Sequence, residues 1–241
     1  DMEGSRGLGD VYKRQPDSFY DGEKFFTEKQ FVEKGMHLLK IGCAVLDVGG
    51  ESTRPGAKEV ASTIEIGRIM GVIKKIKKSV PSAIISVDTR KSIVAEKALE
   101  AGASIVNDIS AGSFDKKMFK VVAKHRAGIC LMHSQGLPEN MQNKPHYDEI
   151  LLDLYDYFQE KIAEAQSNGI PREKIVIDPG IGFGKNTHHN LEIIKKISLF
   201  LGLGRPVMIG ISRKSFIGEI ISEREPSERL IGSVAAMLTT L

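Results

Sequence analysis

The sequence predicts an α/β fold in which parallel strands alternate with helices and curl into a (β/α)8 barrel. From residue 25 onward, short β-branched runs alternate with longer segments of helical spacing. The short runs are apolar throughout, as expected of strands that are buried on both faces. Nearly every run ends in polar residues, which a barrel gathers around one mouth. An open doubly wound sheet also fits the alternation, but it would concentrate these residues at one switch point.

The elements follow one another in regular order. Helices are expected where apolar residues recur every three or four positions, at residues 28–41, 63–78, 92–101, 116–125, 147–166, 191–200 and 229–241. Strands are expected in the short apolar runs between them, at residues 44–48, 83–87, 104–106, 128–132, 174–177 and 206–211. Gly102 stands directly after one helix as a stop signal. A closed barrel needs two strands more than these.

Both ends of the chain depart from the pattern. Residues 1–15 are Gly-rich and charged and do not read as a strand, although residues 16–19 look like the loop after a first strand. The chain stops at Leu241 inside a helical run. We therefore expect residues 1–15 to be a non-family leader, artefactual or disordered, and residues 16–241 to be a partial barrel domain. An incomplete barrel leaves strand edges exposed, so we expect low stability or self-association.

Composition narrows the class of protein. The 241 residues are 41% hydrophobic and 27% charged, which is typical of a globular domain. The net charge of +3 is too small to argue for nucleic-acid binding. No apolar run is long enough to span a membrane, and the N-terminus lacks a signal-peptide core. Cys43 and Cys130 lie in or beside apolar runs, which predicts reduced thiols and a cytoplasmic enzyme.

The loop after residues 44–48 indicates anion binding. Gly49 and Gly50 end the apolar run and allow the backbone to approach a ligand closely. Arg54 carries a planar fork of donors that suits phosphate oxygens, and the hydroxyl of Thr53 stands beside it. The alternative is an ordinary strand-to-helix loop with a solvated arginine.

Other strand ends carry complementary chemistry. Asp88, Asn107 and Asp178 supply hydrogen-bond acceptors, and Lys214 supplies a cation. Helix capping is a competing explanation for Asp88, whereas Lys185 is expected to be solvated. The acceptors suit a flat heterocycle with an edge of N–H donors, and the cations suit a phosphorylated tail. No activated nucleophile is discernible, which favours positioning and leaving-group stabilisation over covalent catalysis.

The motifs DVGGESTRPGA, SVDTRK, IVNDIS, LMHSQG, DPGIGFGK and GISRKSFIG, in this order, resemble the dihydropteroate synthase family over residues 16–241. The resemblance implies an eight-stranded α/β barrel that joins 4-aminobenzoate to 6-hydroxymethyl-7,8-dihydropterin pyrophosphate in folate synthesis. It also implies release of pyrophosphate with Mg²⁺, sensitivity of the family to sulfonamides, and a homodimer built from the late helices.

The resemblance also implies roles for individual residues. Those that would hold the pterin or line its slot are Asp88, Asn107, Asp178, Lys214, Ile109, Met132, Gly182 and Gly210. Those that would meet the pyrophosphate are Thr53 and Arg54. Those that would contact the aminobenzoate are Phe19, Pro55, Phe183 and Ser215. The catalytic set would be Lys214, Asp88, Arg54 and Asp17, the last in a first loop that closes over the site.

Two departures from the family bear on activity. Residues 13–15 read Lys-Arg-Gln where the family has Asn-Val-Thr, so the asparagine that helps to bind pyrophosphate and metal is absent and no metal ligand is predicted. The Arg-x-His pair of the family's last strand is also absent from this sequence. We therefore expect impaired activity. The alternatives are a pterin-dependent methyltransferase, which would have no pyrophosphate to hold, and a non-catalytic pterin-binding protein.

Overall fold

A single parallel sheet forms the centre of the molecule. The computed structural model describes residues 10–13, 27–53, 56–136, 141, 145–222 and 225–240. Its strands are paired in the order β1-β2-β3-β4-β5-β6, and every neighbouring pair is parallel. Their bounds are β1 Asp10–Lys13, β2 Val45–Gly49, β3 Ile84–Asp88, β4 Ile105–Asp108, β5 Gly128–Met132 and β6 Ile175–Asp178.

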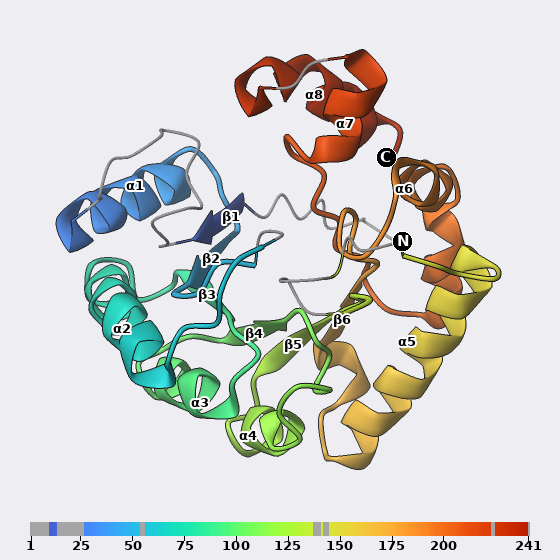
Figure 1. The fold of residues 1–241 in the computed structure, drawn as a ribbon. Coiled ribbons are helices and arrows are strands. Elements are labelled where there is room, and N and C mark those ends of the chain that lie inside the picture. The colour runs from blue at the N-terminus through green and yellow to red at the C-terminus, as the bar shows by residue number, and fades with distance from the viewer. Residues whose placement is uncertain are drawn as a thin grey trace, which may run out of the picture.

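Helices cover the outside of this sheet. They are α1 Glu28–Lys40, α2 Ser62–Ser79, α3 Ser92–Glu100, α4 Met118–Lys124, α5 Ile150–Ser167, α6 Thr187–Lys195, α7 Ser215–Ile221 and α8 Leu230–Leu238. Short 3₁₀ helices lie at Arg172–Lys174, Ile197–Leu203 and Pro226–Arg229. Figure 1 shows α1 to α6 following one another around the outside of the strands. The strand order does not reverse, as it does in a doubly wound sheet, and this excludes a switch point among the described strands.

Local sequence signals fix the ends of several helices. Helix α1 begins at a capping box, in which Thr27 accepts a hydrogen bond from the Gln30 N–H at 3.3 Å and the Gln30 side chain accepts one from the Thr27 N–H at 2.8 Å. Helix α3 ends before Gly102, whose φ of 110° is the left-handed conformation that stops helices. The stop predicted at Gly102 is therefore confirmed.

The register of the sheet separates an apolar face from a polar one. A Cβ placed on Gly35 of α1 would lie 3.5 Å from Leu46, so the face that carries Leu46 and Val48 is turned toward the helices. Side chains alternate between faces along a strand, so Asp47 and Gly49 belong to the inner face. Gly49 pairs in register with Asp88, and Asp88 pairs with Asn107. The polar strand ends thus share the inner face of the sheet.

Two strand predictions are wrong. The prediction that residues 1–15 contain no strand fails at β1, whose Lys13 pairs with Gly49; the pairing uses the backbone of β2 and leaves little trace in the side-chain pattern. The predicted strand at residues 206–211 is reduced to one parallel bridge between Ile177 and Val207. Ile177 donates to the Pro206 carbonyl oxygen and accepts from the Met208 N–H, but the next donor of the ladder would be residue 179, which is a proline without an N–H.

Two further predictions concern the cysteines and the length of the apolar segments. Neither Cys43 nor Cys130 takes part in a disulfide, as predicted. Within the described part of the chain, no helix combines the length and the apolar character that a membrane crossing requires.

Candidate functional site

Three polar side chains lie together on the inner face of the sheet. The Asn107 Nδ2 donates a hydrogen bond to the Asp47 Oδ2 at 3.0 Å, and Asp88 is the in-register neighbour of Asn107. All three side chains are buried. The Asn107 Oδ1 finds no hydrogen-bond partner among the described residues, and an unsatisfied buried acceptor is costly unless a ligand supplies a donor. This face therefore suits a ligand with N–H groups.

Asp47 was missed by sequence reasoning. It stands inside an apolar run, where the general pattern indicates a strand buried on both faces. The available signal was its spacing of two residues from Gly49, because residues at this spacing point to the same face of a strand.

The end of β6 brings a third carboxylate to the same face. The Asp178 Oδ1 accepts a hydrogen bond from the Gly180 N–H at 2.8 Å, and Asp178 pairs in register with Met132. The Asp178 carbonyl oxygen accepts a hydrogen bond from the His133 N–H at 3.0 Å. A Cβ on Gly180 would lie only 2.0 Å from the His133 carbonyl oxygen, and the φ of Gly180 is +67°. Only glycine permits this close approach of the two strand ends.

Lys214 reaches this turn from a distant part of the chain. Its ammonium donates a hydrogen bond to the carbonyl oxygen of Ile181 and lies 4.9 Å from the centroid of the Phe183 ring, which is a cation–π contact. A Cβ on Gly182 would lie 3.2 Å from Lys214 Cδ, and one on Gly210 would lie 3.6 Å from Lys214 Nζ. The structure therefore brings together four residues that sequence reasoning assigned to one site.

Other predicted site residues lie at neighbouring strand ends. Thr53 is buried in the loop after β2, and Ile109 is buried in the turn after β4. Ser215 is exposed as the first residue of α7. The remaining predicted residues lie outside the described part of the chain, and they are Asp17, Phe19, Arg54 and Pro55.

The prediction that Lys185 is solvated is wrong, because only 2% of it is exposed. Its ammonium lies 2.9 Å from the His133 Nδ1 and donates to the Phe183 carbonyl oxygen at 3.0 Å. Burial lowers the pKa of Lys185 to about 7; Asp178 opposes this shift and Lys214 adds to it. Burial, aided by Lys185, lowers the pKa of His133 to about 2. Lys185 thus fastens the turn after β6 to the end of β5.

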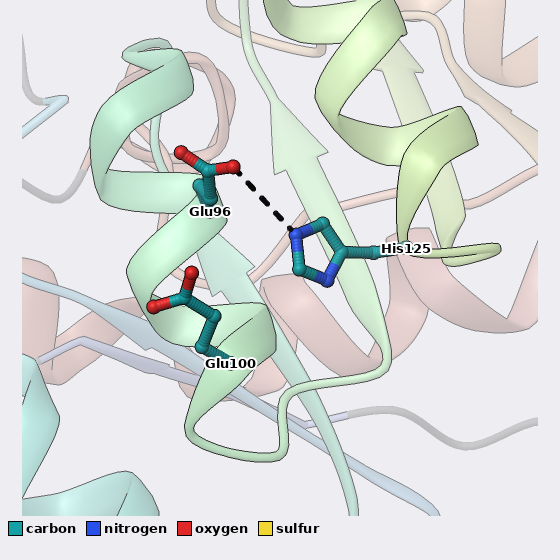
Figure 2. Close-up of side chains that lie close together, drawn as sticks. All are labelled: Glu96, Glu100 and His125. Carbon is teal, nitrogen blue, oxygen red and sulfur yellow. Dashed lines mark ion pairs between the residues drawn. The ribbon is translucent and has the colours of Figure 1, made fainter.

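A separate group of possible metal ligands lies away from the strand ends. Among the described residues, Glu96, Glu100 and His125 alone have donor atoms that all lie within 4.8 Å of one another (Figure 2). They lie at the ends of α3 and α4 that precede the next strands, opposite the polar strand ends. Lys124 pairs with Glu96 at 2.7 Å and Lys97 pairs with Glu100 at 2.8 Å. This group is a surface ion-pair network and not part of the candidate site.

Comparison with known proteins identifies consistent relatives. A family model described as pterin binding enzyme matches residues 10–241. The dihydropteroate synthase of Synechocystis sp. is 37% identical over 225 residues, which cover 93% of this chain and 78% of that protein. Among solved structures, the Yersinia pestis dihydropteroate synthase in a sulfonamide drug complex has a TM-score of 0.90 and 36% identity, covering 95% of this chain and 82% of that one. The Xanthomonas albilineans dihydropteroate synthase with 4-aminobenzoic acid has a TM-score of 0.87 and 37% identity, covering 95% and 81% of the two chains.

Proposed function

The chain belongs to the pterin binding enzymes and, within that family, to the dihydropteroate synthases, and from this premise we propose how its residues serve the reaction. The enzyme is a transferase that joins a dihydropterin pyrophosphate to 4-aminobenzoate in folate synthesis. The bond from the pterin methylene carbon to the pyrophosphate oxygen breaks. A bond from that carbon to the aminobenzoate nitrogen forms, and the nitrogen loses a proton. The nucleophile is the substrate amine, so the protein acts by positioning and by stabilising charge.

The observation that carries the proposal is the set of acceptors on the inner face. The amino-pyrimidine edge of a pterin presents N–H donors, and Asp88, Asn107 and Asp178 present acceptors to the same space. The unpartnered Oδ1 of Asn107 is the clearest support, because a bound pterin would satisfy it. Met132, Ile109 and the glycines of the turns would line the slot for the flat ring.

The cations would act on the leaving group. Lys214 holds its ammonium at the edge of the turn that carries Gly182, where a pterin tail would emerge. Thr53 and Arg54, in the loop after β2, would hold the pyrophosphate oxygens, and Ser215 would meet the aminobenzoate carboxylate. The aminobenzoate ring would lie against Phe183, with Phe19, Pro55 and Asp17 closing the other side.

We propose Mg²⁺ as an ion carried chiefly by the substrate. Among the described residues, no group of three acidic, histidine or cysteine donors at the strand ends has metal-ligand spacing. Such a site fits Mg²⁺ that is bound mainly through substrate phosphates and water. When bound, the ion would supply positive charge to the departing pyrophosphate.

The finer features of fold and assembly are proposals as well. The sequential strand order and the ring of helices support a (β/α)8 barrel, of which β1 to β6 are the described strands (Figure 1). Helix α8 exposes 83% of Ile231 and 63% of Leu238, and an apolar face of this kind supports a homodimer formed through the late helices. Sedimentation of the wild type against Ile231→Lys would test the dimer. A cytoplasmic location stays a prediction.

The assay supplies the dihydropterin pyrophosphate and labelled 4-aminobenzoate with Mg²⁺ or with a chelator. We expect labelled dihydropteroate and pyrophosphate only with Mg²⁺, and little of either, because residues 13–15 lack the asparagine that helps to bind pyrophosphate in the family. Asn107→Ala should weaken pterin binding about tenfold or more, since a buried hydrogen bond is lost. The matched control is Asn168→Ala at the end of α5, whose side chain donates to Glu164. Pterin binding without product would favour the non-catalytic alternative.

A further inference from the structure

Four charged side chains form a buried cluster beside the loop that follows β2 and carries Thr53. They are Glu51, Glu65, Arg90 and Lys91, and each side chain is at most 7% exposed. Glu51 follows β2, Glu65 lies on α2, and Arg90 and Lys91 join β3 to α3. The cluster balances two carboxylates against two cations, as burial of charge requires. It forms no part of the proposed pterin site.

The ion pairs of the cluster centre on Lys91. Its ammonium contacts a carboxylate oxygen of Glu51 and lies 3.0 Å from the Glu65 Oε2. The Arg90 Nε lies 3.2 Å from the other oxygen of Glu51, and its guanidinium stacks 4.1 Å above the Phe114 ring centroid. Glu51 is therefore held on both carboxylate oxygens.

The same groups hold the far end of the loop. The Lys91 Nζ donates to the Val60 carbonyl oxygen at 2.5 Å, and the Glu51 Oε2 accepts from the Val60 N–H at 2.8 Å. The Arg90 Nη2 also lies 3.7 Å from the exposed Glu59. Residues 51 and 60 are thereby tied to each other and to the start of α3. The segment between them, residues 52–59, contains Thr53 and Arg54.

We propose that this cluster is a positioning device that closes the base of residues 52–59 and sets how Thr53 and Arg54 approach the pyrophosphate; the inference rests on the proposed function. A segment pinned at both ends has fewer conformations to lose when it binds an anion. A buried ion pair is a poor source of stability, because apolar residues of similar size serve as well. The charged side chains also make directional hydrogen bonds to the Val60 backbone, which apolar side chains could not make.

The test compares two ligands that differ only in the pyrophosphate. Lys91→Met should weaken binding of the dihydropterin pyrophosphate about tenfold or more, because a displaced loop misaligns its donors. Binding of 6-hydroxymethyl-7,8-dihydropterin should stay within about twofold. The matched control is Lys124→Met, which removes the lysine partner of Glu96 on the surface and should change neither affinity.

Hydrogen exchange provides a readout that needs no ligand. In Lys91→Met, the amides of residues 52, 53 and 56–59 should exchange faster while those of the strands do not. If Lys91→Met does not fold, Glu51→Gln keeps the side-chain shape and should show the same pattern to a smaller degree.

The outcomes separate the two hypotheses. A wild type that binds neither pterin overturns the proposed function. The comparison of hydrogen exchange at residues 52, 53 and 56–59 between the wild type and Lys91→Met then still tests the positioning role. Equal weakening of both ligands in Lys91→Met, or unchanged exchange and affinity, would overturn the positioning role.

Discussion

Replacing Gly180 with alanine tests how closely the turn after β6 approaches β5. The added Cβ would lie 2.0 Å from the His133 carbonyl oxygen, whereas real Cβ contacts stay beyond 3.0 Å. The turn must therefore move by about 1 Å. The φ of +67° adds about 1–2 kcal/mol for any residue with a Cβ.

The displacement also affects Asp178. The hydrogen bonds from the Gly180 N–H and the His133 N–H to Asp178 would be weakened, at about 1 kcal/mol each. We therefore expect Gly180→Ala to lower the free energy of unfolding by about 2–4 kcal/mol. Because the Asp178 carboxylate moves with the turn, turnover should fall by about 100-fold.

Urea unfolding and single-turnover rates on wild type and Gly180→Ala provide the measurements. A free energy of unfolding within about 0.5 kcal/mol of the wild type would refute the steric argument, because changes of that size are typical of substitutions on an unconstrained surface. A clear loss of stability with unchanged turnover would instead show that Asp178 does not position the substrate.

Two further predictions concern the exposed Gly67 and the buried His133. Gly67 is exposed inside α2 and a Cβ there meets nothing within 4 Å, so Gly67→Ala should raise the free energy of unfolding by about 1 kcal/mol; a decrease would contradict the contact-free geometry. Burial lowers the pKa of His133 from 6.5 to about 2, so below pH 6.5 the unfolded chain takes up a proton that the native chain does not. Relative to His133→Gln, the wild type should therefore lose about 1.4 kcal/mol per pH unit between about pH 6 and 3 in urea melts, and equal slopes would refute the burial argument.

The sequence predicted the alternation of elements because β-branched runs and helical spacing are local properties. It also predicted that Asp88, Asn107 and Asp178 lie close together, because the carboxyl ends of parallel strands meet at the same edge of a sheet. It failed where the outcome depends on partners elsewhere in the chain. The burial of Lys185 depends on how two loops pack, and no local pattern distinguishes it from a solvated lysine.

The buried cluster around Lys91 was missed for a related reason. Its members stand at positions 51, 65, 90 and 91, and each alone is typical of a solvated residue on a loop or helix. The strand expected at residues 206–211 shows the opposite error. The run is apolar, but the pattern takes no account of the hydrogen bond that Pro179, after the neighbouring strand, cannot donate.

The sequential order of the sheet bears on how the chain folds as it is synthesised. Ser86 of β3 pairs with Ile105 of β4, and Ile129 of β5 pairs with Ile175 of β6, so each strand pairs with the one made just before it. The entropy lost on closing a loop rises with its length, and among the described residues each closure from β2 to β6 spans one α-helix and its loops. Each new strand can therefore dock onto a growing edge as it leaves the ribosome, before the next one is made.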